Sequence, residues 1–181
     1  SPTNVVVFGV PVDIATIKTN DANGVPLRLG QLVTVRGIMT VGNEFGGPSY
    51  IQDNTAGMGI FGSALSSVVS VGDEVIVTGK IEPFSGLFEL VNPYVNQIVS
   101  SGNEVIPLVV NCSQIANDGT GGVELYEGLL VRLNVVTTSA SGTWAYTNYT
   151  LSDASGATQI RIDNTTNIIG TAVPGSSFDV I

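Results

Sequence analysis

The second half of this chain repeats the first, and this repeat limits the possible folds more than any other feature. In each half a glycine, Gly30 or Gly128, precedes an apolar run of strand length. Two further segments recur: 50–53 with Gly57 returns as 149–153 with Gly156, and 71–77 returns as 174–180. The sequence therefore predicts a lead-in at residues 1–28, a first β-repeat at 29–100 and a second β-repeat at 101–181.

The second copy stops one strand short of the first. The first copy continues past Val77 into a further predicted strand at 87–95, whereas the second copy ends at the counterpart of Thr78. A β-module without its last strand has an open sheet edge, and open edges pair with other chains. We therefore expect an edge that accepts a strand, formed by Phe178, Val180 and Ile181.

The N-terminal run at 4–10 is the predicted donor of that strand. It is apolar on both faces, which is typical of a strand covered on both sides, and its apolar residues are Val5, Val6, Val7, Phe8 and Val10. Donation to a neighbouring copy is β-augmentation, and a head-to-tail contact that does not close produces filaments or tubes. The first hypothesis is therefore a non-catalytic structural protein that self-assembles. Two alternatives stay open: the run folds back onto its own second repeat, or the chain is a fragment of a longer protein.

Strand follows strand along the whole chain. Short runs rich in β-branched residues are separated by Gly, Asn, Asp or Pro, which predicts an all-β fold. The predicted strands lie at 32–41, 49–52, 59–61, 74–79 and 87–95 in the first copy, and at 129–137, 143–151, 158–162 and 178–181 in the second. A short helix is predicted within 61–71, and 12–19 fits a helix or a strand. The order predicts two OB-like or Greek-key barrels, although two sandwiches or one jelly roll would use similar strands.

Composition favours assembly and argues against several classes of partner. Hydrophobic residues make up 43% of the chain and charged residues 12%, so we expect the apolar excess to be buried in the fold or in a homo-oligomer or polymer. No apolar run approaches the ~20 residues of a membrane span. The net charge of −9 argues against nucleic acid, because such binding relies on neutralising phosphates.

Other residue types favour an extracellular or cell-surface location. The chain is rich in Ser, Thr and Asn, and Asn111, Asn148 and Asn164 begin glycosylation sequons whose use the sequence leaves open. The single Cys112 excludes an intramolecular disulfide, and we expect it to act as a small buried hydrophobe.

Segments 33–40, 49–53 and 71–79 resemble the OB-fold modules of secreted bacterial and archaeal proteins, some of which sit beside extracellular nuclease domains. The second copy is similar at 126–131 and 149–153. The resemblance implies a second hypothesis: an accessory module of an extracellular enzyme that binds carbohydrate or nucleic acid. In overall plan, the chain also resembles strand-exchanging subunits of extracellular filaments or tubules.

The residue types do not favour catalysis. The chain has no His, which excludes Ser-His-Asp and Cys-His systems and imidazole-bound zinc. Glu82 and Glu89 flank a predicted hairpin, and a glycosidase needs two carboxyl groups across a cleft. We interpret both as charges on a solvent-facing hairpin and expect the chain not to be an enzyme.

Ligand faces of OB barrels use the second and third strands. Aromatic residues near those strands are candidates for stacking on sugars or bases, or are core and interface residues: Tyr50, Trp144, Tyr146 and Tyr149. Because Trp144 and Tyr146 alternate, we predict that both rings lie on one face of a strand.

Calcium is the one cofactor that the sequence suggests. Asp21 and Asn23 offer oxygen ligands at alternate positions before a glycine, and Asp118 and Asp163 lie in further oxygen-rich turns. The distal bidentate acid of a complete calcium loop is missing. Plain Asx turns explain each segment locally, so both interpretations stay open.

Overall fold

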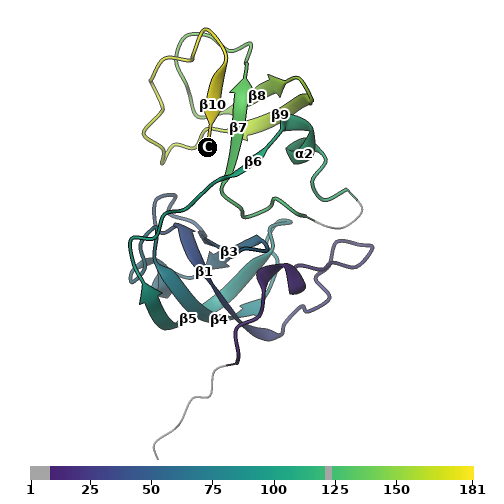
Figure 1. Cartoon of the computed structure of the whole chain (residues 1–181), viewed down its shortest axis with the longest axis vertical. Coiled ribbons are helices and arrows are strands. Elements are labelled where there is room, and N and C mark those ends of the chain that lie inside the picture. Colours follow the sequence, from purple (N-terminus) through teal and green to yellow (C-terminus); the bar gives the residue numbers. More distant parts are fainter. Residues whose placement is uncertain (1–8, 121–123) are drawn as a thin grey trace, which may run out of the picture.

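The computed structural model describes residues 9–120 and 124–181, which form two lobes joined end to end (Figure 1). The first lobe contains β1 (Leu32–Val41), β2 (Ser49–Gln52), β3 (Gly57–Phe61), β4 (Glu74–Ile81) and β5 (Glu89–Ser100). The second contains β6 (Leu108–Val110), β7 (Val131–Val136), β8 (Asn148–Asp153), β9 (Gly156–Arg161) and β10 (Phe178–Val180). Helical segments are short: η1 (Ile14–Thr16), α1 (Ser63–Ser66) and α2 (Cys112–Ala116). The all-β prediction is confirmed.

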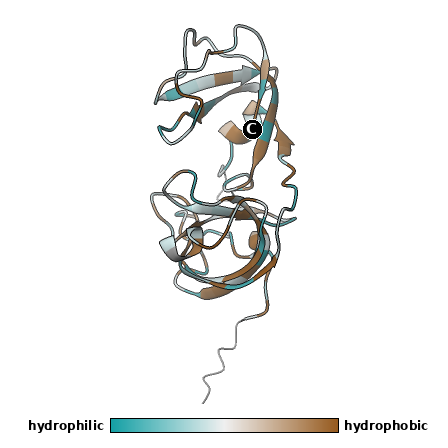
Figure 2. Ribbon diagram, turned by 90° about the vertical axis from the view of Figure 1, so that its left-hand side faces the viewer, coloured by the Kyte–Doolittle hydropathy of each residue, from teal (hydrophilic) through white to brown (hydrophobic). Residues whose placement is uncertain are grey.

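The first lobe is a closed barrel in the order β1-β2-β3-β5-β4. The neighbouring strands are antiparallel except β3 and β5, which are parallel. Along β4 buried and half-buried residues alternate, as a strand with one face toward a core requires. The apolar side chains of the barrel strands form one buried cluster that includes Met39, Ile51, Ile60 and Val77. Figure 2 shows hydrophobic segments in the strands of both lobes.

The second lobe forms an open arrangement in the described residues. Its strands make a three-stranded sheet in the order β10-β7-β6 and a separate β8–β9 pair. The predicted strand at 143–151 begins later, at Asn148, because residues 142–144 instead pair with 171–173 through Trp144 N to Thr171 O and Val173 N to Gly142 O. No described helix is long and apolar enough to cross a membrane.

A carboxylate on the β2–β3 turn fastens the start of the first repeat. Asp53 Oδ2 accepts the backbone N–H of Ile14 at 2.8 Å, and Thr55 Oγ1 accepts that of Ala15 at 3.1 Å. Val12 also forms a parallel bridge with Val35 of β1. These contacts place the segment around η1 on the first barrel.

The second repeat has the same arrangement, which we call the Asp-turn clasp in both copies. Asp153 Oδ2 accepts Cys112 N–H at 2.8 Å, and Ser155 Oγ accepts Ser113 N–H at 3.0 Å. Several hydrogen bonds to its carboxylate, first from Ser155, lower the pKa of Asp153 to about 2. The fully buried Cys112 begins α2, so it is a small buried hydrophobe as predicted. The internal repeat therefore extends upstream of the two glycines that open each apolar run.

Part of the predicted strand donor lies outside the described residues, namely Val5, Val6, Val7 and Phe8. Val10 is described, lies outside any strand and is 85% exposed. The predicted acceptor is β10, which pairs with β7 and has Ile181 exposed at its end.

Candidate functional site

The second repeat covers the part of the outer face of β2 and β3 that Gln52 and Gly57 form in the first repeat. Gly57 lies on this face, and a Cβ added there would collide with the backbone of Gly128. Beside it, Gln52 Oε1 accepts the N–H of Leu130 at 3.0 Å. Gly128 itself has a φ of 78°, which favours glycine, and its turn fits directly against Met58. The repeats are therefore joined by close backbone contact at Gly57 and Gly128 and by a hydrogen bond from the Leu130 backbone to the Gln52 side chain.

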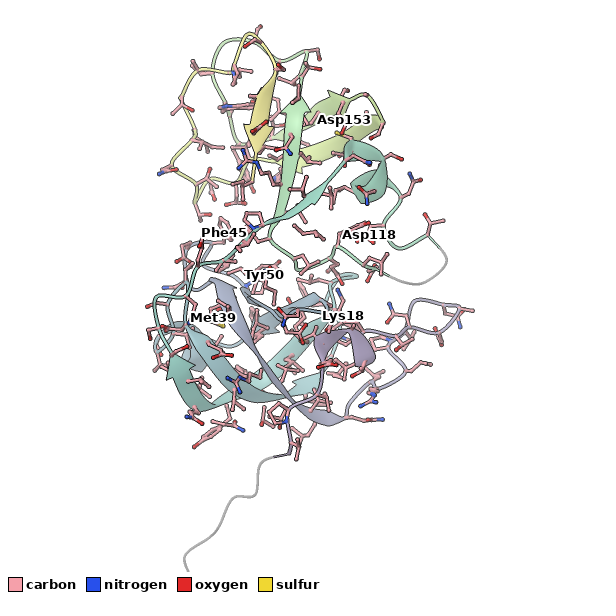
Figure 3. All side chains as sticks on the ribbon, viewed as in Figure 1. Lys18, Met39, Phe45, Tyr50, Asp118 and Asp153 are labelled. Carbon is pink, nitrogen blue, oxygen red and sulfur yellow. The ribbon has the colours of Figure 1, made fainter. Side chains whose placement is uncertain are left out.

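A buried ion pair supports the same junction. Lys18 Nζ donates to the carbonyl of Glu127 at 2.7 Å and lies 3.6 Å from its Oε2, while Glu127 Oε1 accepts the N–H of Phe88 at 3.0 Å. Burial lowers the pKa of Lys18 and raises the pKa of Glu127 to about 7. Figure 3 shows Lys18 and Tyr50 at the end of the barrel that faces the second repeat.

Glu89 lies on the covered outer face and not on a solvent-facing hairpin. It pairs with Gly59 of β3 and is only 3% exposed, and desolvation raises its pKa. Burial also raises the pKa of Tyr50, with smaller contributions from Glu89 and Glu127. The expectation of a solvent-facing Glu82–Glu89 pair is therefore wrong for Glu89, because its side chain is buried in the fold.

The equivalent outer face of the second repeat is exposed. We call it the hairpin face, and it consists of the outward residues of β8 and β9: Asn148, Thr150, Ser152, Ala157, Gln159 and Arg161. Cross-strand pairs align Asn148 with Arg161 and Thr150 with Gln159. The face therefore presents amide and hydroxyl groups and one cation. Its Ala157 stands where the first repeat has Gly57, so it lacks the glycine that admits a backbone there.

An exposed aromatic ring borders the hairpin face. Arg161 lies 4.3 Å from the ring centre of Tyr146, which is 53% exposed. Arg161 also donates to Asn148 Oδ1 at 3.1 Å. The guanidinium is thus held between an aromatic ring and an amide, so both are preorganised for contact with a ligand.

Trp144 and Tyr149 pack against each other, whereas Tyr146 is exposed. Trp144 is buried and meets Tyr149 edge to face at a centroid distance of 4.7 Å and Phe178 at 6.2 Å. Tyr149 Oη accepts the N–H of Ala145 at 2.8 Å. The prediction that Trp144 and Tyr146 share one strand face is wrong, because these residues precede β8.

The predicted calcium residues bond to the backbone in turns. Asp21 Oδ1 accepts the N–H groups of Asn23 and Val25, and Asp163 Oδ1 accepts that of Thr165. Asp118 accepts three backbone N–H groups from residues 125–127. Within 9–120 and 124–181, no three His, Cys, Asp or Glu residues gather closely enough to hold a metal.

A groove of about 540 Å³ lies along the first barrel. It lies between the lead-in at 11–13, the β2–β3 turn and the linker at 104–106. Two of its carboxylates already have partners: Asp53 belongs to the Asp-turn clasp, and Glu74 accepts Arg36 Nε at 2.8 Å. Fewer of its carboxylates are therefore available to bind a ligand than the list of lining residues suggests.

Comparison with known proteins gives one informative match. The chain is 29% identical over 176 residues to "Endonuclease YhcR" of Bacillus subtilis (strain 168). The match covers 90% of this chain but only 14% of that protein's length. No family model and no solved structure matches the sequence. The chain is therefore similar to one region of a much longer protein that is named for an endonuclease activity.

Proposed function

We propose that this chain is a non-catalytic accessory module of an extracellular enzyme and that it binds a neutral carbohydrate on the hairpin face. The observation that carries the module assignment is the similarity to a small part of Endonuclease YhcR. The matched region is a small part of that protein, so the catalytic residues of the endonuclease can lie outside it. The chain has no His, and its buried Asp73 already accepts the N–H of Ser70 in the turn before β4.

The chemistry of the hairpin face favours sugar over phosphate. Asn148, Thr150 and Gln159 supply donors and acceptors suited to sugar hydroxyls, and Tyr146 supplies an exposed ring. Nucleic-acid binding draws on several cations that neutralise phosphates, whereas Arg161 is the one cation of this face and the whole chain carries −9.

The test is a titration with a soluble chitin oligosaccharide and, separately, with oligothymidylate, followed by NMR. We expect the oligosaccharide to shift the amide signals of β8 and β9. Tyr146→Ala should weaken that binding at least about tenfold, which corresponds to about 1.4 kcal/mol of lost stacking. Phe84→Ala, which removes a 71% exposed ring from the first repeat, is the matched control and should leave binding unchanged.

The other outcomes overturn parts of the proposal. Shifts of β8 and β9 with oligothymidylate alone would replace carbohydrate by nucleic acid as the ligand. If neither probe shifts these strands, the hairpin face is not a binding face of this kind.

Self-assembly by strand exchange is the second candidate function. The observation that favours it is the position of β10 at an edge of its sheet. Light scattering of the full chain and of a variant lacking residues 1–10 tests it, because loss of the N-terminal run should abolish large assemblies. Assemblies of unchanged size in the shortened chain would exclude that run as the donor.

A further inference from the structure

A hollow of about 450 Å³ opens on the hairpin face beside α2, which packs against β9 (Figure 1). It is bordered by one residue of α2 and four of the hairpin: Ala116, Thr150, Ala157, Thr158 and Gln159. In the first repeat Gly57 corresponds to Ala157, and it meets the backbone of Gly128. The second repeat therefore has a hollow where the first has an internal contact.

The side chains around the hollow combine methyl groups with amide and hydroxyl groups. Ala116 and Ala157 are exposed, and so are the side chains of Thr150 and Gln159. Neither of these two polar side chains has a hydrogen-bonding partner among residues 9–120 and 124–181. A primary amide offers both donors and an acceptor, and methyl groups gain from losing water on contact. A ligand that matches the hollow carries a methyl group directly beside an amide.

We propose that the hollow is a subsite for the N-acetyl group of an amino sugar, so that the hairpin face selects oligosaccharides that contain N-acetylhexosamine. The acetamido methyl group contacts Ala116 and Ala157, and the acetamido N–H and C=O bind the amide of Gln159. The subsite rests on the carbohydrate binding proposed for the hairpin face and names the sugar. An acetamido group is uncharged, whereas the like charge of an acidic substituent would oppose the chain's −9.

The position of the hollow also sets the length of the ligand. Ala157 and Arg161 lie at opposite ends of the outward row of β9, and at about 3.3 Å per residue they are roughly 13 Å apart. The ring of Tyr146 lies beside Arg161, with 4.3 Å between the guanidinium and the ring centre. An oligosaccharide that stacks on Tyr146 and reaches the hollow therefore spans several sugar units.

Two soluble oligosaccharides with the same β-1,4-linked backbone test the subsite. One is the tetramer of N-acetylglucosamine, and the other is the tetramer of glucose, which has a hydroxyl in place of each acetamido group. Calorimetry of the full chain measures both affinities, and NMR locates the binding. We expect the N-acetylated tetramer to bind at least about tenfold more tightly, from one buried methyl group and the amide hydrogen bonds. It should shift the amide signals of Ala116 and Ala157 and should bind more tightly than single N-acetylglucosamine.

Ala157→Leu fills the hollow and separates its contribution from that of the rest of the face. We expect this variant to weaken binding of the N-acetylated tetramer about tenfold and to leave binding of the glucose tetramer unchanged. Ala15→Leu is the matched control, because it adds the same side chain at an exposed alanine of the first repeat. It should leave both affinities unchanged.

The remaining outcomes distinguish the subsite from the proposed function. Equal affinities of the two tetramers at β8 and β9 would overturn the subsite and leave carbohydrate binding by the hairpin face intact. A preference for the N-acetylated tetramer that persists in Ala157→Leu would have the same meaning. Failure of both tetramers to shift these strands would overturn the proposed function and the subsite together.

Discussion

Gly57 and Gly128 bring two backbones into contact at the junction of the repeats, where a side chain on either would collide with its neighbour. Glycine usually serves a turn, but Gly57 lies within β3 and has no unusual φ. Its role is therefore close approach, which fixes the position of the second repeat on the first.

Gly57→Ala should destabilise the protein by about 1–3 kcal/mol, because the added methyl group forces the junction apart. Urea unfolding measures the loss, and limited proteolysis near residue 128 should become faster. Gly47→Ala is the matched control, since a Cβ there meets only ordinary contacts. Equal stability of the two variants would contradict the close packing at the junction.

At the scale of elements, the sequence predicts a strand well where the residues of that strand alone carry the pattern. The bounds of β1 and β2 match their predictions, because alternation and β-branched residues identify half-buried strands. The helix α2 was not predicted, although Asn111 and Gln114 form a capping box that marks a helix start. The covered face of β2 and β3 gave no local signal, because Gln52 and Leu130 are far apart in sequence.

The same limit explains the candidate site residues. Glu89 was interpreted as a surface charge, and Lys18 and Glu127 were not singled out, because the contact of Lys18 with Glu127 depends on which faces of the two repeats meet. For Trp144 the sequence left two roles open, because a large aromatic residue in an alternating pattern suits both a binding face and a core. The structure places it in the core. The polar residues of the hairpin face were accessible to sequence reasoning, because alternation along a strand identifies its outer face. Tyr146 was named as a candidate aromatic residue, but it precedes β8 and strand alternation does not place it.

The junction formed by β2, β3 and the segment 124–130 should depend on pH. Glu127 has a pKa raised from 4.5 to about 7 by burial, with Lys18, Glu124, Glu89, Tyr50 and Asp118 as the charged or titratable groups in the surrounding network. A raised carboxyl pKa contributes stability that is fully present below pH 4.5 and is lost as the pH rises through about 7.

Glu127→Gln removes this ionisation and keeps an oxygen for the N–H of Phe88. The wild-type chain should therefore lose stability relative to the variant as the pH rises from 4.5 to above 7, as followed by urea midpoints. Glu82→Gln changes an exposed glutamate of the first repeat and should show no such trend. A constant difference between wild type and Glu127→Gln would contradict a titrating junction.

For the whole molecule, closure of one repeat and openness of the other predict unequal stability. The first barrel has every strand paired on both sides, and its core residues are almost completely buried. The second lobe has free strand edges and several half-buried core residues. Local opening follows such differences in burial and hydrogen bonding.

Hydrogen exchange followed by mass spectrometry should show slow exchange in β1 and β4 and faster exchange in β8, β9 and β10. The reverse order would mean that the second lobe has cover that the described residues do not supply.

The covering of one outer face by the neighbouring repeat has a consequence for stoichiometry. Two repeats of one fold would ordinarily offer two equivalent ligand faces, and a titration would end at two equivalents per chain. Here the face on β2 and β3 is occupied by the chain itself, so the two copies are not equivalent. The proposed carbohydrate binding should therefore saturate at one equivalent per chain, with the hairpin face of the second repeat as its site.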